Sequence, residues 1–205
     1  VELQNVTFAY EDDSRKILHH LSFKVYTGEQ VTLSGRTGAG KSTVFKLLLG
    51  LYQPEEGKVL IQGRDAFQIP EHEKRSLYGY VEQTFHRVPG TVKDQITLYD
   101  DSFTMEEVRD AARIAGLDAT IEQLEKGYDT LCTSEIFSQG QWQLLSIARA
   151  AVAKPKLLLL DEITANLDAQ TEEEVLQALK RASEGRTVIS ISHRVNAETG
   201  RIITF

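Results

Sequence analysis

The chain has 205 residues, of which 41% are hydrophobic and 26% are charged, so it has the composition of a globular protein of one large or two small domains. Its net charge of -7 argues against a nucleic-acid-binding protein, because such proteins present a basic face. The only cysteine, Cys132, excludes a disulfide within the chain and suits a reducing compartment.

The N-terminal residues, up to about position 35, are expected to form strands. Three segments, residues 1–3, 6–8 and 21–25, combine β-branched and aromatic side chains with the alternation of a half-buried strand. Another apolar run, residues 31–33, predicts a further strand. Because the chain begins inside the first strand-like segment, we expect it to be a piece of a longer protein.

The segment after this last strand contains a phosphate-binding loop. It fits the pattern G-x-x-x-x-G-K-S/T and precedes a helical pattern at residues 44–49 that stops near Gly50 and Pro54. Glycines let backbone N–H groups turn toward phosphate oxygens, and the start of the helix adds a positive end. The lysine is expected at the β- and γ-phosphates and the serine hydroxyl at Mg²⁺. The expected ligands are Gly35, Arg36, Thr37, Gly38, Ala39, Gly40, Lys41, Ser42 and Thr43.

The middle of the chain is expected to begin with strands at residues 58–61 and 78–81 and then to be mostly helical from about 91 to 154. The spelling Thr104-Met105-Glu106-Glu107 predicts a capping box at the start of one helix, which ends near Gly116. A shorter helix is expected to end near Gly127. A third is expected to open at Ser138 and to be closed by Pro155.

Strands and helices alternate in the last part of the chain. Residues 157–160 form a continuous apolar run that is far too short to cross a bilayer and is typical of a strand buried on both faces. Thr171 is expected to cap the next helix, and residues 188–191 are expected to form another strand. This alternation predicts an α/β fold with a largely parallel sheet, split by a helical insertion.

Polar side chains follow three of the expected strands. Asp161 and Glu162 follow the buried strand, and Gln83 and His193 follow two others. Ligands of such sheets bind at the carboxyl ends of the strands. Asp161 is therefore expected to hold Mg²⁺ and Glu162 to accept a proton from an attacking water. Taken alone, a histidine is more often structural or on the surface, and a single glutamine carries little weight.

Taken together and in order, these motifs resemble the nucleotide-binding domain of ABC transporters over nearly the whole chain. The matching segments are Phe8-Ala9-Tyr10, the phosphate loop, Gln83, Phe137-Ser138-Gln139-Gly140-Gln141, Asp161-Glu162-Ile163-Thr164, Ala165-Asn166-Leu167-Asp168 and Ile191-Ser192-His193-Arg194. The resemblance implies that Tyr10 stacks on adenine and that His193 senses the γ-phosphate. It also implies that Gln83 serves Mg²⁺ beside Ser42 and Asp161, and that Asp168 lies in the nucleotide-contacting D-loop.

The segment around Ser138 looks like the family's signature motif, usually L-S-G-G-Q. Its spelling, S-x-x-Q, is also that of a capping box, and the two interpretations are compatible because a helix start that needs a cap is also an anion site. The resemblance implies that Ser138, Gly140 and Gln141 face the γ-phosphate of ATP held by another copy. Gln139 replaces the first signature glycine: it either tolerates this approach or blocks it, which would leave a degenerate half-site.

The spacing from Gln83 to Gly90-Thr91-Val92 resembles that of ABC exporters, in which G-T-I/V begins the helical subdomain, and Gly127-Tyr128-Asp129-Thr130 is also similar to exporters. Two further features depart from the family. Residues 131–136 lack the glycine that exporters usually have there, which leaves the contact with a membrane domain open. The chain also ends soon after His193, at residues 201–205, which we interpret as a truncation or a shortened terminus.

The resemblance implies one nucleotide-binding domain over residues 1–205: a P-loop ATPase core with a small antiparallel β portion and a helical subdomain at about 84–154. It implies that two copies, identical or not, bind ATP and Mg²⁺ head to tail and hydrolyse the ATP to drive an exporter. The implied partner is a transmembrane domain, with this domain at the cytoplasmic face of the membrane and no nucleic acid bound. The alternatives are a non-hydrolysing ATP-dependent dimerisation switch and a soluble ABC ATPase.

Overall fold

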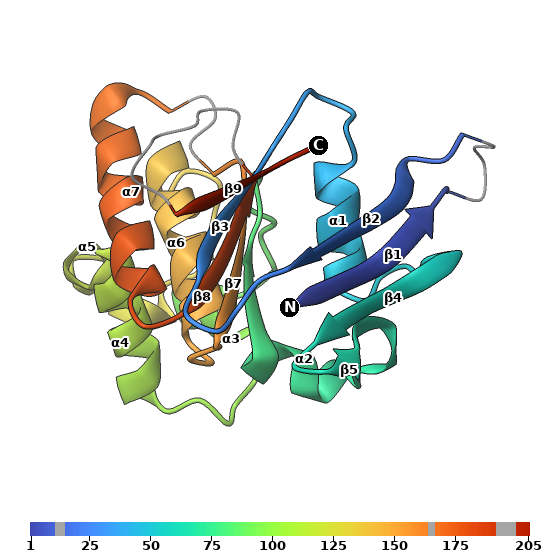
Figure 1. Cartoon of the computed structure of the whole chain (residues 1–205). Coiled ribbons are helices and arrows are strands. Elements are labelled where there is room, and N and C mark those ends of the chain that lie inside the picture. Colours follow the sequence, from blue (N-terminus) through green and yellow to red (C-terminus); the bar gives the residue numbers. More distant parts are fainter. Residues whose placement is uncertain (11–14, 164–166, 192–199) are drawn as a thin grey trace. The chain divides into compact units, whose positions relative to one another are not determined.

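The computed structural model describes residues 1–10, 15–163, 167–191 and 200–205 (Figure 1). They form two compact units, one made of Val1–Leu77 with Arg186–Phe205 and the other of Tyr78–Gly185. Among these described residues, no helix has the length and apolar character needed to cross a membrane.

The first unit contains a four-stranded antiparallel sheet in the order β2-β1-β4-β5. Its strands are β1 (Glu2–Phe8), β2 (Leu18–Lys24), β4 (Glu56–Ile61) and β5 (Arg64–Asp65), followed by η1 (Ala66–Gln68) and α2 (Glu71–Leu77). The two segments expected at residues 1–3 and 6–8 form the single strand β1, whose pairing register shifts between Leu3 and Val6. Leu3, Val6 and Phe8 are buried, so this strand supplies part of the core of the unit.

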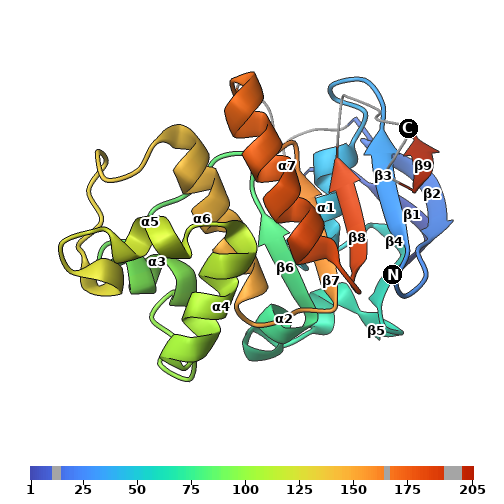
Figure 2. The same cartoon turned by 90° about the vertical axis from the view of Figure 1, so that its left-hand side faces the viewer.

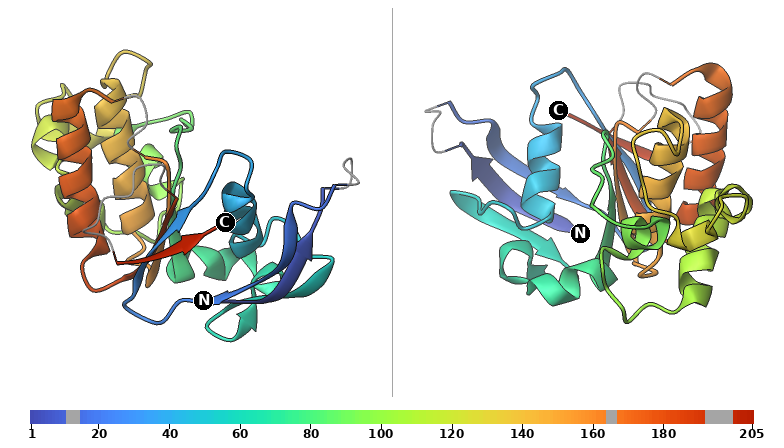
Figure 3. Two further views of the ribbon diagram at one scale, coloured as in Figure 1. Left: turned by 45° about the horizontal axis from the view of Figure 1, so that its top comes forward. Right: turned by 180° about the vertical axis from the view of Figure 1, so that it is seen from behind.

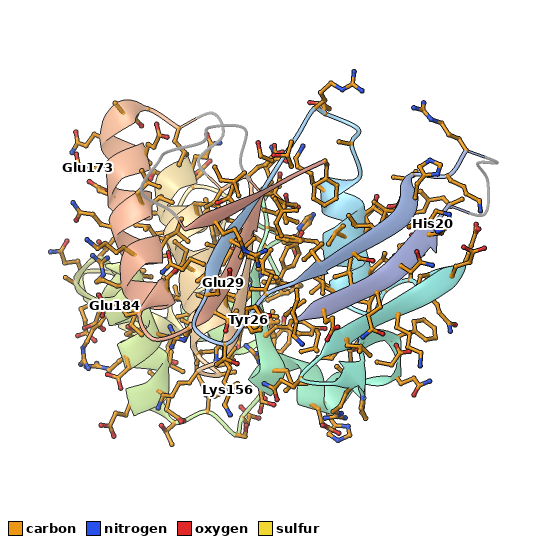
Figure 4. The ribbon with its side chains drawn as sticks, in the orientation of Figure 1. His20, Tyr26, Glu29, Lys156, Glu173 and Glu184 are labelled. Carbon is orange, nitrogen blue, oxygen red and sulfur yellow. The ribbon has the colours of Figure 1, made fainter. Side chains whose placement is uncertain are left out.

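The first unit also contains three parallel strands in the order β8-β3-β9: β3 (Gln30–Ser34), β8 (Thr187–Ile191) and β9 (Arg201–Thr204). The hydroxyl groups of Thr32 on β3 and Ser190 on β8 form a hydrogen bond, with 3.0 Å between their oxygens. The strand β9 was not predicted. Arg201 Nε donates to Glu29 at 2.7 Å, and Glu29 accepts from the Tyr26 N–H. The turn that carries Tyr26 and Glu29, both labelled in Figure 4, is therefore tied to β9.

The second unit combines a parallel strand pair, β6 (Tyr78–Val81) and β7 (Leu157–Asp161), with helices. The helices are α3 (Val92–Thr97), α4 (Met105–Ala115), α5 (Asp118–Glu122), η2 (Gly127–Asp129), α6 (Gln139–Ala151) and α7 (Ala169–Ser183). Helix α6 packs against α4 and α7, and it runs beside α7 in several views (Figures 2 and 3). A Cβ on Gly79 of β6 would lie 2.4 Å from the Ala150 carbonyl oxygen, so a glycine lets α6 approach the strand.

Together the two units contain five parallel strands and a separate antiparallel sheet, which confirms the predicted α/β class. The capping boxes predicted at Thr104 and Ser138 are both present, and Gly116, directly after α4, is its C-cap in the left-handed conformation, with φ of 80°. The prediction that a shorter helix ends near Gly127 is wrong, because this helix, α5, ends at Glu122.

The cap predicted for the helix after β7 is also wrong. Asp168, rather than Thr171, caps α7: its side chain accepts a hydrogen bond from the Thr171 N–H at 3.1 Å. Thr171 is therefore inside the first turn. Aspartate is among the best N-caps. Because Asp168 precedes Thr171 in the chain, the helix begins directly after Asp168 and includes the threonine.

Candidate functional site

The phosphate-binding loop connects β3 to α1 (Lys41–Leu48) in the first unit. Gly38 and Gly40 have φ of 81° and 96°, values that L side chains rarely adopt. Gly40 is the N-cap of α1, and no side chain makes a capping hydrogen bond there. A Cβ at Gly40 would lie 2.6 Å from Leu18 Cδ2, so this glycine also lets the loop pack on β2. The first N–H groups of α1 are thus open to an anion.

Lys41 places a buried cation inside this loop. Its residue is only 4% exposed, and its Nζ donates to the carbonyl oxygens of Gly35 at 2.9 Å and Arg36 at 3.0 Å. Backbone carbonyls are weaker partners for an ammonium than phosphate oxygens are, because they carry no net charge. The side chain is therefore held where phosphates can replace the carbonyls. Ser42, the predicted magnesium ligand of the loop, is exposed.

Tyr10 lies in an aromatic cluster of the first unit. Its ring meets Phe8 edge-on at 5.0 Å and Tyr52 at 5.3 Å between centroids, and Lys46 Nζ lies 5.1 Å from its centre. Its hydroxyl is 3.3 Å from Thr43 Oγ1, a residue of the predicted phosphate site. The structure therefore links the predicted adenine-stacking residue to the phosphate loop through a contact that the sequence did not indicate.

We expect Tyr10 to contribute ATP affinity through its ring. Stacking on an aromatic side chain is worth about 1–3 kcal/mol per base in nucleic-acid binders, so Tyr10→Ala should weaken ATP binding by roughly 5- to 150-fold. Tyr10→Phe should bind nearly as well as the parent, because the 3.3 Å hydroxyl contact is long for an O–H···O bond. Calorimetry measures both affinities. Tyr26→Ala, a change at an exposed tyrosine before β3, is the control (Figure 4). Equal affinities in all variants would contradict a stacking role.

Asp161 and Gln83 lie at or just beyond the ends of two paired strands of the second unit. Asp161 is the last residue of β7, and Gln83 comes two residues after β6, whose Val81 is aligned with Leu160. The Tyr80 hydroxyl donates to Asp161 Oδ2 at 3.1 Å. Burial and the neighbouring Asp161 carboxylate raise the pKa of Tyr80 well above its ordinary value, so the phenol remains a donor. Carboxylate and amide oxygens are hard donors that fit Mg²⁺.

Glu162, the predicted general base, has an unusual backbone. Its φ is 45°, in the left-handed region that non-glycine residues seldom occupy, and its side chain is half-buried. The chain therefore turns sharply directly after Asp161. Conformations of this kind cluster at active sites, where the surrounding structure holds them in place.

The start of α6 meets the start of α7 within the second unit. Gly140 is buried, and a Cβ built on it would lie only 2.1 Å from Thr171 Cγ2. Thr171 Oγ1 donates to Asp168 Oδ2 at 2.5 Å, and the hydrogen bonds from Thr171 lower the pKa of Asp168. The glycine of the signature-like segment is thus required by packing within one chain. It brings Gly140 and Asp168, two of the predicted site residues, to the same threonine.

The two residues beside Gly140 complete the helix start. Ser138 Oγ accepts from the Gln141 N–H at 3.2 Å, and Gln141 Oε1 accepts from the Ser138 N–H at 2.9 Å. Gln139, the departure from the family motif, is the first residue of α6 and is exposed. Its side chain is therefore directed to the surface rather than into the core.

Helix α6 holds the segment after β6 by contacts that the sequence did not predict. Gln143 Nε2 donates to the Glu82 carbonyl oxygen at 3.0 Å. Arg149 donates to the carbonyl oxygens of His86 at 2.9 Å and Gln95 at 2.6 Å. Its guanidinium lies 4.1 Å from the ring centre of Phe85, and that ring stacks on Trp142. The residues flanking Gln83 are thus fixed to the helix that begins at Ser138.

The helix starts differ in charge. Of the seven α-helices in the described parts of the chain, only α1 and α6 have no acidic residue in the first turn. Gly40 and Ser138, their N-caps, are neutral as well. Because the positive end of a helix dipole attracts anions, these two starts are the ones that suit a phosphate group. They are also the two starts for which the sequence predicted a phosphate contact.

The predicted site residues are divided between the units. The first unit holds Tyr10, Gly35, Arg36, Thr37, Gly38, Ala39, Gly40, Lys41, Ser42 and Thr43; the second holds Gln83, Ser138, Gly140, Gln141, Asp161, Glu162 and Asp168. His193 lies outside the described residues, as do positions 164–166.

A glycine loop after a parallel strand, a buried lysine on its carbonyls and a carboxylate pair at the end of a buried strand define a nucleotide-binding α/β protein of the phosphate-loop class. The chain belongs to the ABC transporter family, whose model matches residues 18–165. This membership confirms the resemblance drawn from the ordered motifs, and proteins of this family bind ATP through such domains.

Three relatives illustrate the match. YfiC of Bacillus subtilis (strain 168), an uncharacterized ABC transporter ATP-binding protein, is 42% identical over 198 residues, covering 96% of this chain and 33% of that protein. YheH of the same organism, a probable multidrug resistance ABC transporter ATP-binding/permease protein, is 37% identical over 96% of this chain and 29% of its own length. The leukotoxin translocation ATP-binding protein LktB of Mannheimia haemolytica is 37% identical over 96% of this chain and 28% of its own length.

A solved structure of a bacterial Atm1-family ABC exporter with ATP bound superimposes with a TM-score of 0.87 and 36% identity, covering 100% of this chain and 36% of that one. The chain spans about a third of the length of the curated relatives it matches.

Proposed function

We propose that this chain is the nucleotide-binding domain of an ABC exporter and that it binds and hydrolyses ATP. The observation that carries the proposal is the charge pattern of the helix starts. Helices α1 and α6 are the two described α-helices without an acidic first turn, and they begin within the phosphate loop and the signature-like segment, respectively. A polyanion is favoured at positive helix ends whose first turns carry no carboxylate.

The residues of the phosphate loop would hold the phosphates, with the Lys41 ammonium moving from the loop carbonyls to their oxygens. Tyr10 would receive the adenine. Ser42, Gln83 and Asp161 would supply oxygen ligands to Mg²⁺, which neutralises charge on the phosphates. Glu162 would accept a proton from the attacking water while the bond between the γ-phosphorus and the bridging oxygen breaks.

Two copies would act together, head to tail. Ser138, Gly140 and Gln141 of one copy would face the γ-phosphate of the ATP held by the other, with Asp168 beside them. His193 would contact the same phosphate. We further propose that residues 1–205 form one nucleotide-binding domain with a helical subdomain at about 84–154. Its partner is a transmembrane domain, and it acts at the cytoplasmic face of the membrane.

Steady-state ATP turnover with Mg²⁺, before and after chelation with EDTA, tests this proposal. We expect metal-dependent turnover accompanied by ATP-dependent dimers in sizing chromatography. Dimers without turnover would favour a non-hydrolysing switch instead.

The same assay on Gln139→Gly addresses the altered signature. Because Gln139 is exposed at the first position of α6, we expect the reversion to change turnover only modestly. A variant that hydrolyses ATP while the parent does not would identify the parent as a degenerate half-site. Such a half-site would work with an unlike partner.

A further inference from the structure

The hydrogen bond between Tyr80 and Asp161 joins two neighbouring parallel strands. Tyr80 of β6 is aligned with Leu159 of β7, and Asp161 lies two residues further along β7. Side chains two residues apart in a strand lie on the same face of the sheet, so the register brings Tyr80 and Asp161 to one face. The Tyr80 hydroxyl reaches across the strand pair and donates a hydrogen bond to Asp161 Oδ2 at 3.1 Å.

A carboxylate at the end of a strand rotates about two side-chain bonds, and a metal site needs one of the resulting orientations. A donor fixed to one carboxylate oxygen removes much of this freedom. Tyr80 is suited to that task because it is half-buried on the adjacent strand and has only two side-chain torsions to order.

We propose that Tyr80 is a positioning residue that holds the Asp161 carboxylate in the orientation that serves Mg²⁺. This inference rests on the proposed function, in which Asp161 is a magnesium ligand. Residues that hydrogen-bond to the ligands of a metal typically change metal affinity or activity by about 10- to 100-fold when they are removed. A purely structural bond would instead change the stability of the β6–β7 pair and leave the metal dependence as it was.

Tyr80→Phe removes the hydroxyl and keeps the ring. The matched control is Tyr128→Phe, because Tyr128 is a buried tyrosine of the same unit whose hydroxyl donates to another aspartate, Asp118 Oδ1, at 2.6 Å. Both changes are made in a Glu162→Gln background, so that ATP is not consumed. Bound metal is measured by the loss of the free Mn²⁺ signal in electron paramagnetic resonance, with ATP present at a lower concentration than the protein, so that little ATP is free to bind the metal by itself. Calorimetry of ATP binding at a series of Mg²⁺ concentrations gives a second readout.

We expect Tyr80→Phe to weaken the apparent Mn²⁺ affinity by about 10-fold or more. At saturating metal the ATP affinity of Tyr80→Phe should return to near that of its parent. The turnover of a Tyr80→Phe variant that keeps Glu162 should likewise return to near that of the unaltered protein. Tyr128→Phe should leave the metal titration unchanged. Thermal unfolding of both variants without nucleotide shows how much stability each bond provides.

Coincident Mn²⁺ titrations for Tyr80→Phe and its parent would overturn the inference, and so would a defect that saturating metal does not repair. Asp161→Asn in the same titration separates this failure from that of the proposed function. If Asp161→Asn weakens Mn²⁺ binding and Tyr80→Phe does not, only the positioning role is lost. If neither variant affects binding, the magnesium role of Asp161 fails and the inference fails with it.

Discussion

Replacing Glu162 with glutamine is expected to lower the rate of ATP hydrolysis by about 10²- to 10⁴-fold, the contribution of a positioned general base. The amide keeps the size of the side chain but is not basic, so ATP binding should be retained. The left-handed backbone at Glu162, with φ of 45°, should also be retained, because glutamine and glutamate differ only at the end of the side chain. The variant should then accumulate as an ATP-bound dimer.

Turnover assays and sizing chromatography with and without ATP measure these two effects. Glu184→Gln, which changes an exposed glutamate at the C-terminal end of α7, is the control for the loss of one charge in the same unit (Figure 4). If Glu162→Gln hydrolyses ATP as fast as the parent, Glu162 is not the base, and another group must accept the proton.

Replacing Lys41 with alanine should weaken ATP binding by about 100-fold or more. A hydrogen bond to a charged group is worth about 1.5–3 kcal/mol, and this ammonium is expected to contact two phosphates. In the structure Lys41 Nζ is buried on the carbonyl oxygens of Gly35 and Arg36, so the loop itself holds the cation in place. The affinity lost should therefore reflect the missing charge rather than a large rearrangement of the loop.

Calorimetry with Mg²⁺ present gives the affinity. Lys58→Ala removes an exposed lysine from β4 of the same unit and should bind ATP like the parent. An affinity of Lys41→Ala within a few-fold of that of Lys58→Ala would remove the basis for assigning residues 35–43 as a phosphate site.

Features written in a few consecutive residues could be predicted from the sequence. The loop at residues 35–43 depends on glycines that adopt positive φ and on the lysine that follows them. The capping boxes at Thr104 and Ser138 each satisfy N–H groups three residues away, so the local sequence is sufficient to predict them. The cap of α7 shows the limit of this logic, because Asp168 and Thr171 both precede the helical pattern and only one of them can start the helix.

Contacts between distant segments could not be predicted. The bond from Tyr80 to Asp161 joins residues 81 positions apart, and that from Arg149 to His86 joins residues 63 apart. Nothing local to either partner indicates the other, since both bonds depend on the pairing of strands and the packing of α6. The short β9 was missed for the same reason: its pairing with β3 and the ion pair of Arg201 with Glu29 are both long-range.

The neutral starts of α1 and α6 resolve a conflict between the net charge of the chain and its ligand. At -7 the protein repels a polyanion at long range. At physiological ionic strength the Debye length is about 8 Å, so counter-ions screen the repulsion from most exposed carboxylates before contact. The starts of α2, α3, α4, α5 and α7 each carry a carboxylate that acts as a permanent counter-ion and removes a competing anion site. Under the proposed function, the placement of the acidic residues, rather than their sum, would direct phosphate to two helix ends.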